Sequence, residues 1–379
     1  MEIAIVAGEP SGDLLAAELV AAFLKKNPKA HFFGVGGEKM QQVGVEIIAP
    51  MAALSVMGYK DALLNLPKIL NIRKRLLKTI FKRKPSVFVG VDAPDFNLNI
   101  EKTLKNQGFK TIHWVSPSVW AWRKKRIFKI KQSVDEIWTL FPFETALYQQ
   151  VNVPAYFLGH PLADKIPLKN DAFKAKEALG LTFNAPVFAF LPGSRLKEVQ
   201  NHANLFVQTA NVLSQKIPKA QFVVPLVNAH LTQIFEESLK HNRNRALFFL
   251  LQKQADQALL SCDVALVASG TATLEAALYK KPMVITYKLS PLTFWLAKKM
   301  VQTKWVGLPN VLCDEEIVPE ILQNAASPKN LAESLFDFYH DQEKRQKVAT
   351  QFLNLHQTLK QNAAENAARR LEIFLKNHL

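Results

Sequence analysis

The amino-acid sequence predicts an α/β protein with two doubly wound domains in series, and three observations lead to this prediction. The chain has 379 residues, which is more than one ordinary hydrophobic core accommodates. Short apolar segments rich in Val, Ile and Phe alternate with segments of helical periodicity, as in a parallel sheet covered by helices on both faces. This alternation restarts near residue 185, so the second half repeats the organisation of the first.

The first half opens with the expected strand "IAIVAG" at residues 3–8, a turn that contains glycine, and the helical pattern "DLLAAELVAAFLKK". Further strands are expected at 30–37, 86–94, 110–118, 135–142 and 155–161. Proline and charged residues interrupt the pattern around 159–173, which indicates a junction between domains.

The second half begins again with a strand, a turn and a helix. Its expected strands lie at 185–195, 220–228, 246–251, 263–270 and 281–288. Beyond about residue 330 the pattern is helical and polar. We therefore divide the chain into an N-terminal domain (1–165), a second domain (166–345) and C-terminal helices (346–379).

Composition narrows the class of protein. Hydrophobic residues make up 49% of the chain and charged residues 21%, which is typical of a folded globular protein. Two cysteines, Cys262 and Cys313, form no disulfide framework and agree with a reducing cytoplasm. We expect neither a signal peptide nor a membrane span. The formal net charge of +16 indicates an anionic partner: nucleic acid, a membrane surface or a phosphorylated substrate.

Ligands of doubly wound sheets bind at the carboxyl ends of strands, so the residues that follow each strand are the candidate site residues. "GEPSGD" at 8–13 offers backbone amides at a helix start, which bind a carboxylate or phosphate. The alternative is an ordinary turn with Ser11 or Asp13 as the helix cap. "FAFLPGSRLKEV" at 188–199 has the same organisation and adds Arg195, which can bind a phosphate with two parallel hydrogen bonds. A simple turn is the alternative there too.

"VASGTATLEAAL" at 267–278 combines small residues after a strand with Glu275 about one turn into the next helix. A carboxylate there could accept hydrogen bonds from the two hydroxyls of a ribose. This segment would then bind the ribose and the turn at Arg195 the phosphates, which together suit a nucleoside diphosphate. The alternative is a helix cap made by Thr271 or Thr273.

"VDAPDFN" at 91–97 places Asp92 and Asp95 after a strand of the first domain, where a buried carboxylate could act as general base. A turn stabilised by Asx hydrogen bonds is the alternative. Asp-x-x-Asp is poor evidence for a metal site, and we predict none. His113 and His160 also follow strands, and each either contacts a ligand or packs in the core.

Two segments concentrate the positive charge. "SPSVWAWRKKRIFKIK" at 116–131 interleaves tryptophans with Lys and Arg, and residues 60–84 combine basic side chains with Ile69, Ile72, Leu76 and Ile80 at helical spacing. The second segment is either an interfacial helix held on anionic lipid or a core-packed helix with a solvated basic face. Nucleic acid is a further candidate, but no recognised binding motif is present.

Taken together, these segments resemble the lipid-A-disaccharide synthase family. The motifs that carry the resemblance occur in the family's order and cover nearly the whole chain: "VAGEPSGD", "VGVDAPDFN", "VSPSVWAWR", "FKI", "LPGSR", "VPLVN", "ASGTATLE", "TFWLAK", and "LPN" before "EIVPE". The resemblance implies a GT-B architecture, with two Rossmann-like domains facing a cleft and C-terminal helices packing back on the N-terminal domain. It also implies a hexosyltransferase of lipid A and lipopolysaccharide biosynthesis in Gram-negative bacteria.

The implied reaction joins UDP-2,3-diacylglucosamine to 2,3-diacylglucosamine 1-phosphate (lipid X). It forms the β-1,6-linked disaccharide 1-phosphate and UDP by inversion, with no cofactor. The implied location is cytoplasmic, peripheral on the anionic inner face of the cytoplasmic membrane. We expect no nucleic-acid partner, and an oligomer stays open.

Site roles carried over from the family follow the matching motifs. Asp92 is the implied general base, and Arg195 the group that stabilises the departing diphosphate. The implied UDP site comprises Gly193, Ser194, Arg195, Ser269, Gly270, Thr271, Glu275 and Asn310. The acceptor side comprises Glu9, Ser11 and Asn97, and the membrane contact Lys74, Arg75 and Lys78.

Three positions depart from the family pattern: Asp61 replaces the usual glutamate, Trp114 a common tyrosine, and Gly307 a frequent serine. The main alternative is another GT-B enzyme, such as a different UDP-sugar transferase or a UDP-N-acetylglucosamine 2-epimerase. The alternative from another class is a nucleic-acid-binding protein, which would bind oligonucleotides with a steep salt dependence and lack affinity for UDP.

Overall fold

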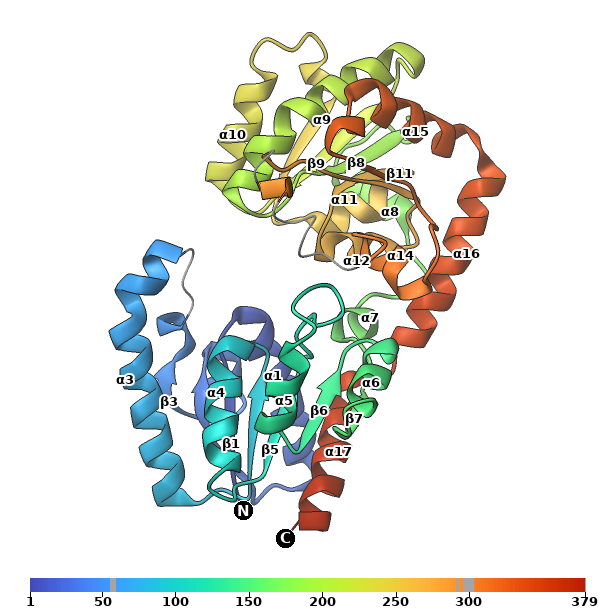
Figure 1. Cartoon of the computed structure of the whole chain (residues 1–379). Helices are drawn as coiled ribbons and strands as arrows, with labels where there is room; N and C mark the ends of the chain where they lie inside the picture. The colour runs from blue at the N-terminus through green and yellow to red at the C-terminus, as the bar shows by residue number, and fades with distance from the viewer. Residues whose placement is uncertain (55–58, 291–292, 296–302, 379) are drawn as a thin grey trace. The chain divides into compact units, whose positions relative to one another are not determined.

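The computed structural model divides into two compact units (Figure 1). The first comprises residues 1–164 and 359–379, and the second residues 165–358. The structure describes residues 1–54, 59–290, 293–295 and 303–378, with side chains from residue 66 onward in the helix that begins at Tyr59. The side chain of Asp61 and residues 296–298 of "TFWLAK" lie outside this description.

The first unit contains a seven-stranded parallel sheet with strand order β3-β2-β1-β4-β5-β6-β7. Its strands are β1 (Glu2–Ala7), β2 (His31–Gly36), β3 (Glu46–Pro50), β4 (Val87–Val91), β5 (Thr111–Trp114), β6 (Glu136–Thr139) and β7 (Ala155–Phe157). Its helices are α1 (Pro10–Lys26), α2 (Glu38–Gln42), α3 (Tyr59–Arg83), α4 (Pro94–Lys105), α5 (Arg126–Ser133), α6 (Pro142–Gln149), α7 (Pro161–Lys165) and α17 (Ala363–His378).

Helices cover both faces of this sheet, which explains why its central strands β1 and β4 are apolar on both faces. Successive side chains of a strand point to opposite faces. Ile3 and Ile5 of β1 accordingly pack in a cluster with α1 and α17, whereas Ala4 and Val6 pack in a second cluster with α3 and α4. The sequence prediction of a buried, doubly wound sheet is confirmed for this unit.

Of the predicted C-terminal helices (346–379), only residues 359–379 belong to the first unit, whereas 346–358 belong to the second. Helix α17 packs on α1 of the first unit. Both carboxylate oxygens of Asp164 accept backbone hydrogen bonds at its start, from Asn362 N at 2.9 Å and Ala363 N at 2.6 Å. Further along, Arg370 Nε donates to Glu136 Oε2 at 2.9 Å, and a second bond from the same guanidinium reaches Glu136 Oε1. Polar contacts as well as the apolar interface therefore hold α17 in place.

The second unit contains a six-stranded parallel sheet with strand order β10-β9-β8-β11-β12-β13. Its strands are β8 (Val187–Leu191), β9 (Gln221–Leu226), β10 (Phe248–Gln252), β11 (Val264–Ala268), β12 (Met283–Tyr287) and β13 (Glu320–Leu322). The described helices are α8 (Ala172–Ala178), α9 (Leu196–Lys216), α10 (Ala229–Leu239), α11 (Ala255–Ser261), α12 (Thr271–Leu278), α14 (Leu308–Cys313), α15 (Pro328–His340) and α16 (Gln342–Leu359).

Strand order reverses between β1 and β4 in the first unit, and between β8 and β11 in the second. At such a reversal the connections leave toward opposite faces, which opens a crevice at the carboxyl ends of the two strands. In the first unit these ends lead into residues 8–13 and 92–97, and in the second into residues 192–195 and 269–271. The topology thus places the four predicted turns in pairs, one pair in each unit.

We expect Arg370→Ala to lower the free energy of unfolding of the first unit by about 3 kcal/mol, because the buried Glu136 carboxylate would lose its paired cation and keep the neutral hydrogen bond from Trp138 Nε1. Urea unfolding monitored by tryptophan fluorescence measures this change, because four of the six tryptophans belong to the first unit. The matched control is Arg369→Ala, which removes an exposed arginine from the same helix and should change stability by about 0.5 kcal/mol or less. Equal effects of the two substitutions would contradict a stabilising role for the pair.

Candidate functional site

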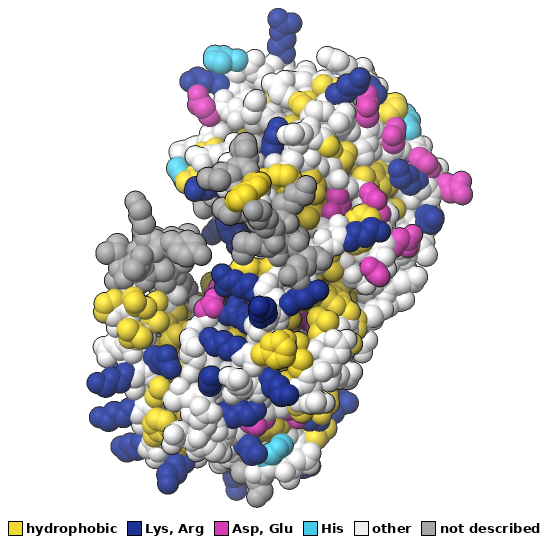
Figure 2. Space-filling model, viewed as in Figure 1, with side chains coloured by type: hydrophobic (Ala, Val, Ile, Leu, Met, Phe, Trp, Pro, Cys, Tyr) yellow, Lys and Arg dark blue, Asp and Glu magenta, His cyan; other side chains and the backbone are white. Residues whose placement is uncertain are grey.

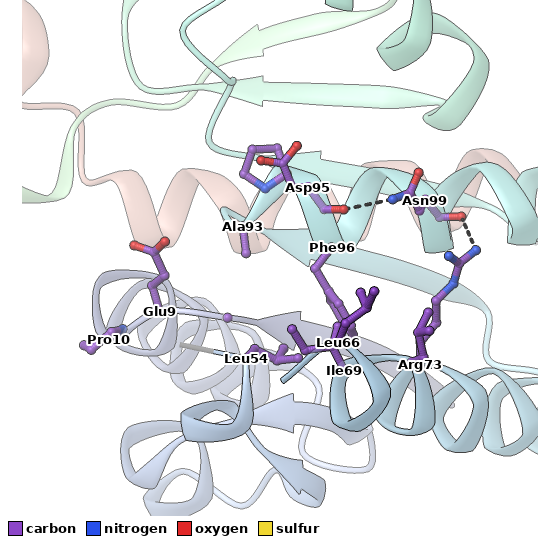
Figure 3. A pocket seen from close by; sticks show the side chains of 13 residues that line it. Glu9, Pro10, Leu54, Leu66, Ile69, Arg73, Ala93, Asp95, Phe96 and Asn99 are labelled. Atoms are coloured by element: carbon purple, nitrogen blue, oxygen red, sulfur yellow. Dashed lines mark hydrogen bonds between the residues drawn. The ribbon is translucent and has the colours of Figure 1, made fainter. Parts of the chain in front are cut away.

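The described part of the first unit has a pocket of about 670 Å³ at the carboxyl ends of β1 and β4 (Figure 3). It is lined by residues of the turns after these strands and of α3 and α4: Gly8, Glu9, Pro10, Leu54, Leu66, Ile69, Leu70, Arg73, Ala93, Pro94, Asp95, Phe96 and Asn99. Figure 3 shows Leu66, Ile69 and Phe96 gathered between Glu9 and Arg73. The pocket is therefore apolar in its middle and polar toward its ends.

Asp92 directly precedes the pocket-lining residues Ala93 and Pro94 and lies in an unusual turn. Asp92 and Ala93 have φ of 54° and 43°, a left-handed conformation that costs roughly 1–2 kcal/mol per non-glycine residue. Asp92 N donates to Trp114 O at 2.8 Å, and Asp92 Oδ1 accepts from Ala93 N at 2.8 Å. The half-buried carboxylate is thus held at the strand end by its own backbone.

Polar contacts also fix the wall of the pocket opposite Glu9. Arg73 of α3 donates to Asn99 O at 3.4 Å and to Thr103 Oγ1 at 3.3 Å, and Asn99 Nδ2 donates to Asp95 O at 2.9 Å. Asp95 itself pairs with Arg126 of α5. These bonds connect α3, α4 and α5 around the pocket.

The predicted acceptor-side residues occupy different environments. Glu9 lines the pocket and Ser11 is exposed in the first turn of α1. Asn97 is completely buried and its amide donates to Asp92 O at 2.8 Å, so it supports the turn and does not line the pocket. Asp13 does not cap α1. Its carboxylate accepts from backbone amides around the start of α2, including Gly37 N at 2.6 Å.

The turn after β8 has the glycine that its geometry requires. Gly193 has φ of 116°, and a Cβ there would lie 2.5 Å from Glu198 Cβ. Glu198 Oε2 accepts from Ser194 N at 3.0 Å and from Arg195 N at 3.1 Å, while Arg195 Nη1 donates to Glu198 Oε1 at 3.3 Å. The two amides predicted to bind phosphate therefore already bind a carboxylate, whereas the Arg195 side chain is 83% exposed.

Glu198 is a residue that the sequence analysis missed, although glutamate at the third position of a helix is the known signal for a capping box. His202, one turn later, is buried, and its Nε2 accepts from Lys288 N at 3.0 Å. Its Nδ1 therefore carries the proton and donates to Glu198 O at 2.7 Å. Burial lowers the pKa of His202, which keeps the ring neutral while it connects α9 to the end of β12.

The turn after β11 is open. Gly270 has φ of 151°, and a Cβ built on it would meet no atom within 4 Å. Ser269 Oγ donates to Val306 O at 3.1 Å, and Thr273, not Thr271, bonds back to Gly270 O at 2.8 Å. Thr271 is exposed at the same turn. The exposed positions of this turn leave room for a ligand beside α12.

Glu275 and Asn310 of the predicted UDP site differ in accessibility. Burial, with a smaller contribution from Asp256, raises the pKa of the half-buried Glu275 carboxyl. Asn310 is completely buried: its Oδ1 accepts from Ile317 N and Val318 N, and its Nδ2 donates to Glu320 Oε1 at 2.9 Å. In this structure Asn310 stabilises the loop before β13, and its side chain is not accessible to solvent.

The apolar stripe predicted for α3 belongs mostly to the core. Leu76 and Ile80 are completely buried, and Ile72 packs against the same cluster. A different face of α3 is exposed, with Leu66 at 48%, Leu70 at 52% and Phe81 at 40%. A shallow groove of about 540 Å³ on this helix is lined by Leu70, Arg73, Lys74, Leu77, Lys78 and Phe81.

Two candidate ligand residues after strands are packing residues. His113 is completely buried in β5, and its Nδ1 lies 2.7 Å from Glu101 Oε1. His160 stacks on Phe141, and burial lowers the pKa of its ring to about 4. Among the described residues, no group of three or more His, Cys, Asp or Glu is arranged to hold a metal ion. No helix in the described ranges is long and apolar enough to cross a membrane.

The loop after β5 depends on Glu144, which the sequence analysis also missed. Glu144 is buried beneath the loop and accepts from Trp120 Nε1 at 3.2 Å and from Phe141 N at 3.2 Å. Ser116 Oγ and Tyr148 Oη form a buried hydrogen bond of 2.8 Å beside it. Burial raises the pKa of Glu144 to about 8. Beyond these anchors Trp122 is exposed together with Arg123, Lys124 and Lys125.

Known structures resemble the whole chain in fold. The UDP-GlcNAc 2-epimerase from Neisseria meningitidis bound to UDP-GlcNAc has a TM-score of 0.66 at 14% identity, with 100% of each chain covered. A glycosyltransferase from Rickettsia africae has a TM-score of 0.61 at 12% identity and covers 99% of this chain and 97% of its own. Together with the two doubly wound sheets, these likenesses define a fold of the GT-B glycosyltransferase class.

Sequence comparison specifies the family within this class. A family model described as "Lipid-A-disaccharide synthetase" matches residues 3–371. The lipid-A-disaccharide synthase of Dechloromonas aromatica is 50% identical over 372 residues, covering 97% of each chain. That of Pseudomonas putida is 46% identical over 375 residues, 99% of this chain and 98% of the relative. The chain belongs to the lipid-A-disaccharide synthase family and is a glycosyltransferase of lipid A disaccharide synthesis.

Glu144 gives a prediction about stability and pH. The folded protein retains the Glu144 proton at pH values where the unfolded chain has released it, because burial raises its pKa to about 8. Its contribution to stability is therefore complete below the ordinary glutamate pKa and is lost as the pH rises through about 8. Urea unfolding at about pH 5 and about pH 9 should show a smaller loss of stability with pH in Glu144→Gln than in the wild type.

The control for this experiment is Glu38→Gln, which changes an exposed glutamate of the same unit and should leave the pH dependence as it is. Identical pH dependences in Glu144→Gln and the wild type would show that the Glu144 proton is not retained on folding.

Proposed function

We propose that this enzyme transfers 2,3-diacylglucosamine from its UDP derivative to the 6-hydroxyl of 2,3-diacylglucosamine 1-phosphate, forming a β-1,6 bond by inversion. The observation that supports this most directly is the pocket beside Asp92, because it adjoins a carboxylate in a strained turn and combines apolar walls with polar ends. An acylated sugar has the same division into apolar chains and polar ring. The volume of about 670 Å³ is within the usual range for small-molecule sites.

Asp92 is the proposed general base. The acceptor hydroxyl attacks C1 of the donor sugar, the bond from C1 to the diphosphate oxygen breaks, and UDP leaves with the bonding electrons. The hydroxyl proton passes to the Asp92 carboxylate. One direct displacement converts an α-linked donor into a β-linked product, so a single base is sufficient and no covalent enzyme intermediate forms.

The second unit is proposed to bind UDP. Arg195 suits the diphosphate because its guanidinium is exposed and held at the turn after β8 by Glu198. Ser194 and Gly193 belong to the same turn, and the open turn Ser269, Gly270 and Thr271 offers approach to the backbone. Glu275 is proposed to accept hydrogen bonds from the ribose hydroxyls. Asn310 acts indirectly, because its side chain holds the loop before β13 in place.

In this proposal the first unit takes the acceptor, with Glu9 and Ser11 on the sugar side of the pocket. The exposed face of α3 rests on anionic lipid at the cytoplasmic side of the membrane. Leu66, Leu70 and Phe81 would enter the interface while Lys74, Arg75 and Lys78 contact phosphates. Leu66 and Leu70 also line the acceptor pocket, so a lipid substrate would reach the pocket from the same surface.

The test of the proposed reaction is release of UDP from UDP-2,3-diacylglucosamine, with and without lipid X, in detergent that contains EDTA. We expect release to require lipid X and to persist with EDTA. Asp92→Asn should lower turnover by about 10²–10⁴-fold as for loss of a general base, and Arg195→Ala by about 10²–10³-fold. Lys197→Ala, which removes an exposed neighbouring cation, should retain wild-type turnover.

A wild-type rate in Asp92→Asn or Arg195→Ala would remove that residue from the mechanism. If UDP release disappears with EDTA, the proposed metal-free reaction is wrong. If no acylated donor releases UDP, the proposed donor is wrong and unacylated UDP-sugars are the next to test.

The membrane contact is tested by replacing Lys74, Arg75 and Lys78 together with glutamate. Each basic residue near an anionic surface contributes about 1 kcal/mol, so affinity for vesicles containing anionic lipid should fall by at least about 100-fold in a sedimentation assay. The matched control replaces Lys25, Lys26 and Lys29 at the end of α1 and after it, which changes the net charge equally. Equal losses in both triple variants would indicate a general charge effect and not a contact through α3.

A further inference from the structure

A buried polar cluster lies beneath the Asp92 turn and has no part in the mechanism described above. It consists of Asn97 and Glu101 of α4 and His113 of β5, and all three are completely buried. Asn97 and Glu101 are one helical turn apart, so they project from the same face of α4. His113 lies beside Gly90 of β4 in the sheet register.

Gly90 allows α4 to place these side chains against the sheet. A Cβ on Gly90 would lie 3.0 Å from Asn97 Cβ and 2.1 Å from Glu101 Oε1. Any larger residue at position 90 would therefore displace both side chains. The close approach holds the first two turns of α4 in a defined position above the end of β4.

Asn97 connects this cluster to the strained turn. Its Nδ2 donates to Asp92 O at 2.8 Å and lies within 3.5 Å of Val6 O and Val91 O. One buried amide thus joins the ends of β1 and β4 to the residue that carries the proposed base. The left-handed conformations of Asp92 and Ala93 need such external support, because local backbone preferences oppose them.

Glu101 and His113 hold the other end of the cluster. His113 Nδ1 and Glu101 Oε1 are 2.7 Å apart, and burial raises the pKa of Glu101. Among the described buried atoms without a hydrogen-bond partner are Glu101 Oε2, His113 Nε2 and Asn97 Oδ1. Replacing a buried pair of this kind by apolar side chains of similar volume is often neutral or stabilising, so stability alone does not account for the pair.

We propose that Asn97 is a positioning residue that orients the Asp92 carboxylate, and that the Glu101–His113 pair keeps Asn97 in place by fixing α4 on β4 and β5. The inference rests on the proposed role of Asp92. It assigns Asn97 a function through the backbone of the turn in place of direct contact with the acceptor.

A double-mutant cycle between Asn97 and Asp92 tests the proposal. In the transfer assay, Asn97→Ala should lower kcat at least about tenfold while KM for lipid X changes by less than about threefold, since the substrate pocket is retained. In the Asp92→Asn background the same substitution should have almost no further effect, because an oriented base no longer exists. Asn106→Ala, an exposed position at the end of α4, is the matched control and should retain wild-type kcat.

Equal fold losses from Asn97→Ala in both backgrounds, or a wild-type kcat for Asn97→Ala alone, would overturn the proposal. A wild-type rate for Asp92→Asn would instead refute the proposed base itself, whatever Asn97 does. If Asn97→Ala does not fold, as judged by its thermal unfolding, Asn97→Ser takes its place in the cycle with the same expected and contradicting outcomes.

Two variants of Glu101 test the supporting pair. Glu101→Gln retains an oxygen that can accept from His113 and should keep kcat within about threefold of the wild type. Glu101→Ala removes the bond and should lower kcat in the same way as Asn97→Ala, again only when Asp92 is present. Wild-type kcat in Glu101→Ala would show that the pair does not support Asn97.

Discussion

The parallel pairing of β1 with β4, and of β8 with β11, is the constraint on which the candidate site depends. At these pairs the strand order of each sheet reverses, so two turns end side by side with no crossover connection above them. The residues of these turns lie outside the hydrogen-bonding pattern of the sheet, but rigid strands hold the turns in place. Asp92 in the first unit and Arg195 in the second both hold such positions.

The sequence was sufficient to predict these turns because they follow almost completely buried strands with a clear apolar pattern. It missed the edge strands β3 and β13, whose apolar stretches are short and whose side chains are mostly only partly buried. It also assigned Asn97 and Asn310 to ligand contact, whereas both are completely buried and bind backbone groups. Periodicity cannot distinguish a polar side chain that faces a ligand from one that satisfies a strained or irregular backbone nearby, because the local sequence does not show which group the side chain contacts.

The apolar stripe of α3 shows that the sequence pattern also cannot tell which face of a helix is exposed. Helical spacing of Ile72, Leu76 and Ile80 is correct for an amphipathic helix, yet that face packs on the sheet. The exposed apolar residues are on another face and among lysines, where a hydrophobic pattern alone gives no signal. Figure 2 shows many Lys and Arg side chains on the visible face of the first unit, with hydrophobic side chains among them. Part of the positive charge of the chain therefore lies on this face of the first unit.

Glu198 changes how the turn after β8 can meet a diphosphate. A helix start with free amides would bind phosphate through its backbone, but here a carboxylate of the same helix accepts from both Ser194 N and Arg195 N. In the proposed reaction, the charge of the leaving diphosphate would then be met mainly by the exposed guanidinium of Arg195. Glu198 also accepts a hydrogen bond from Arg195 Nη1. The carboxylate that occupies the two backbone amides therefore also orients the Arg195 guanidinium. Lysine at position 195 would keep the charge but lack the planar guanidinium, which can bind Glu198 through Nη1 and still offer further N–H groups to a phosphate.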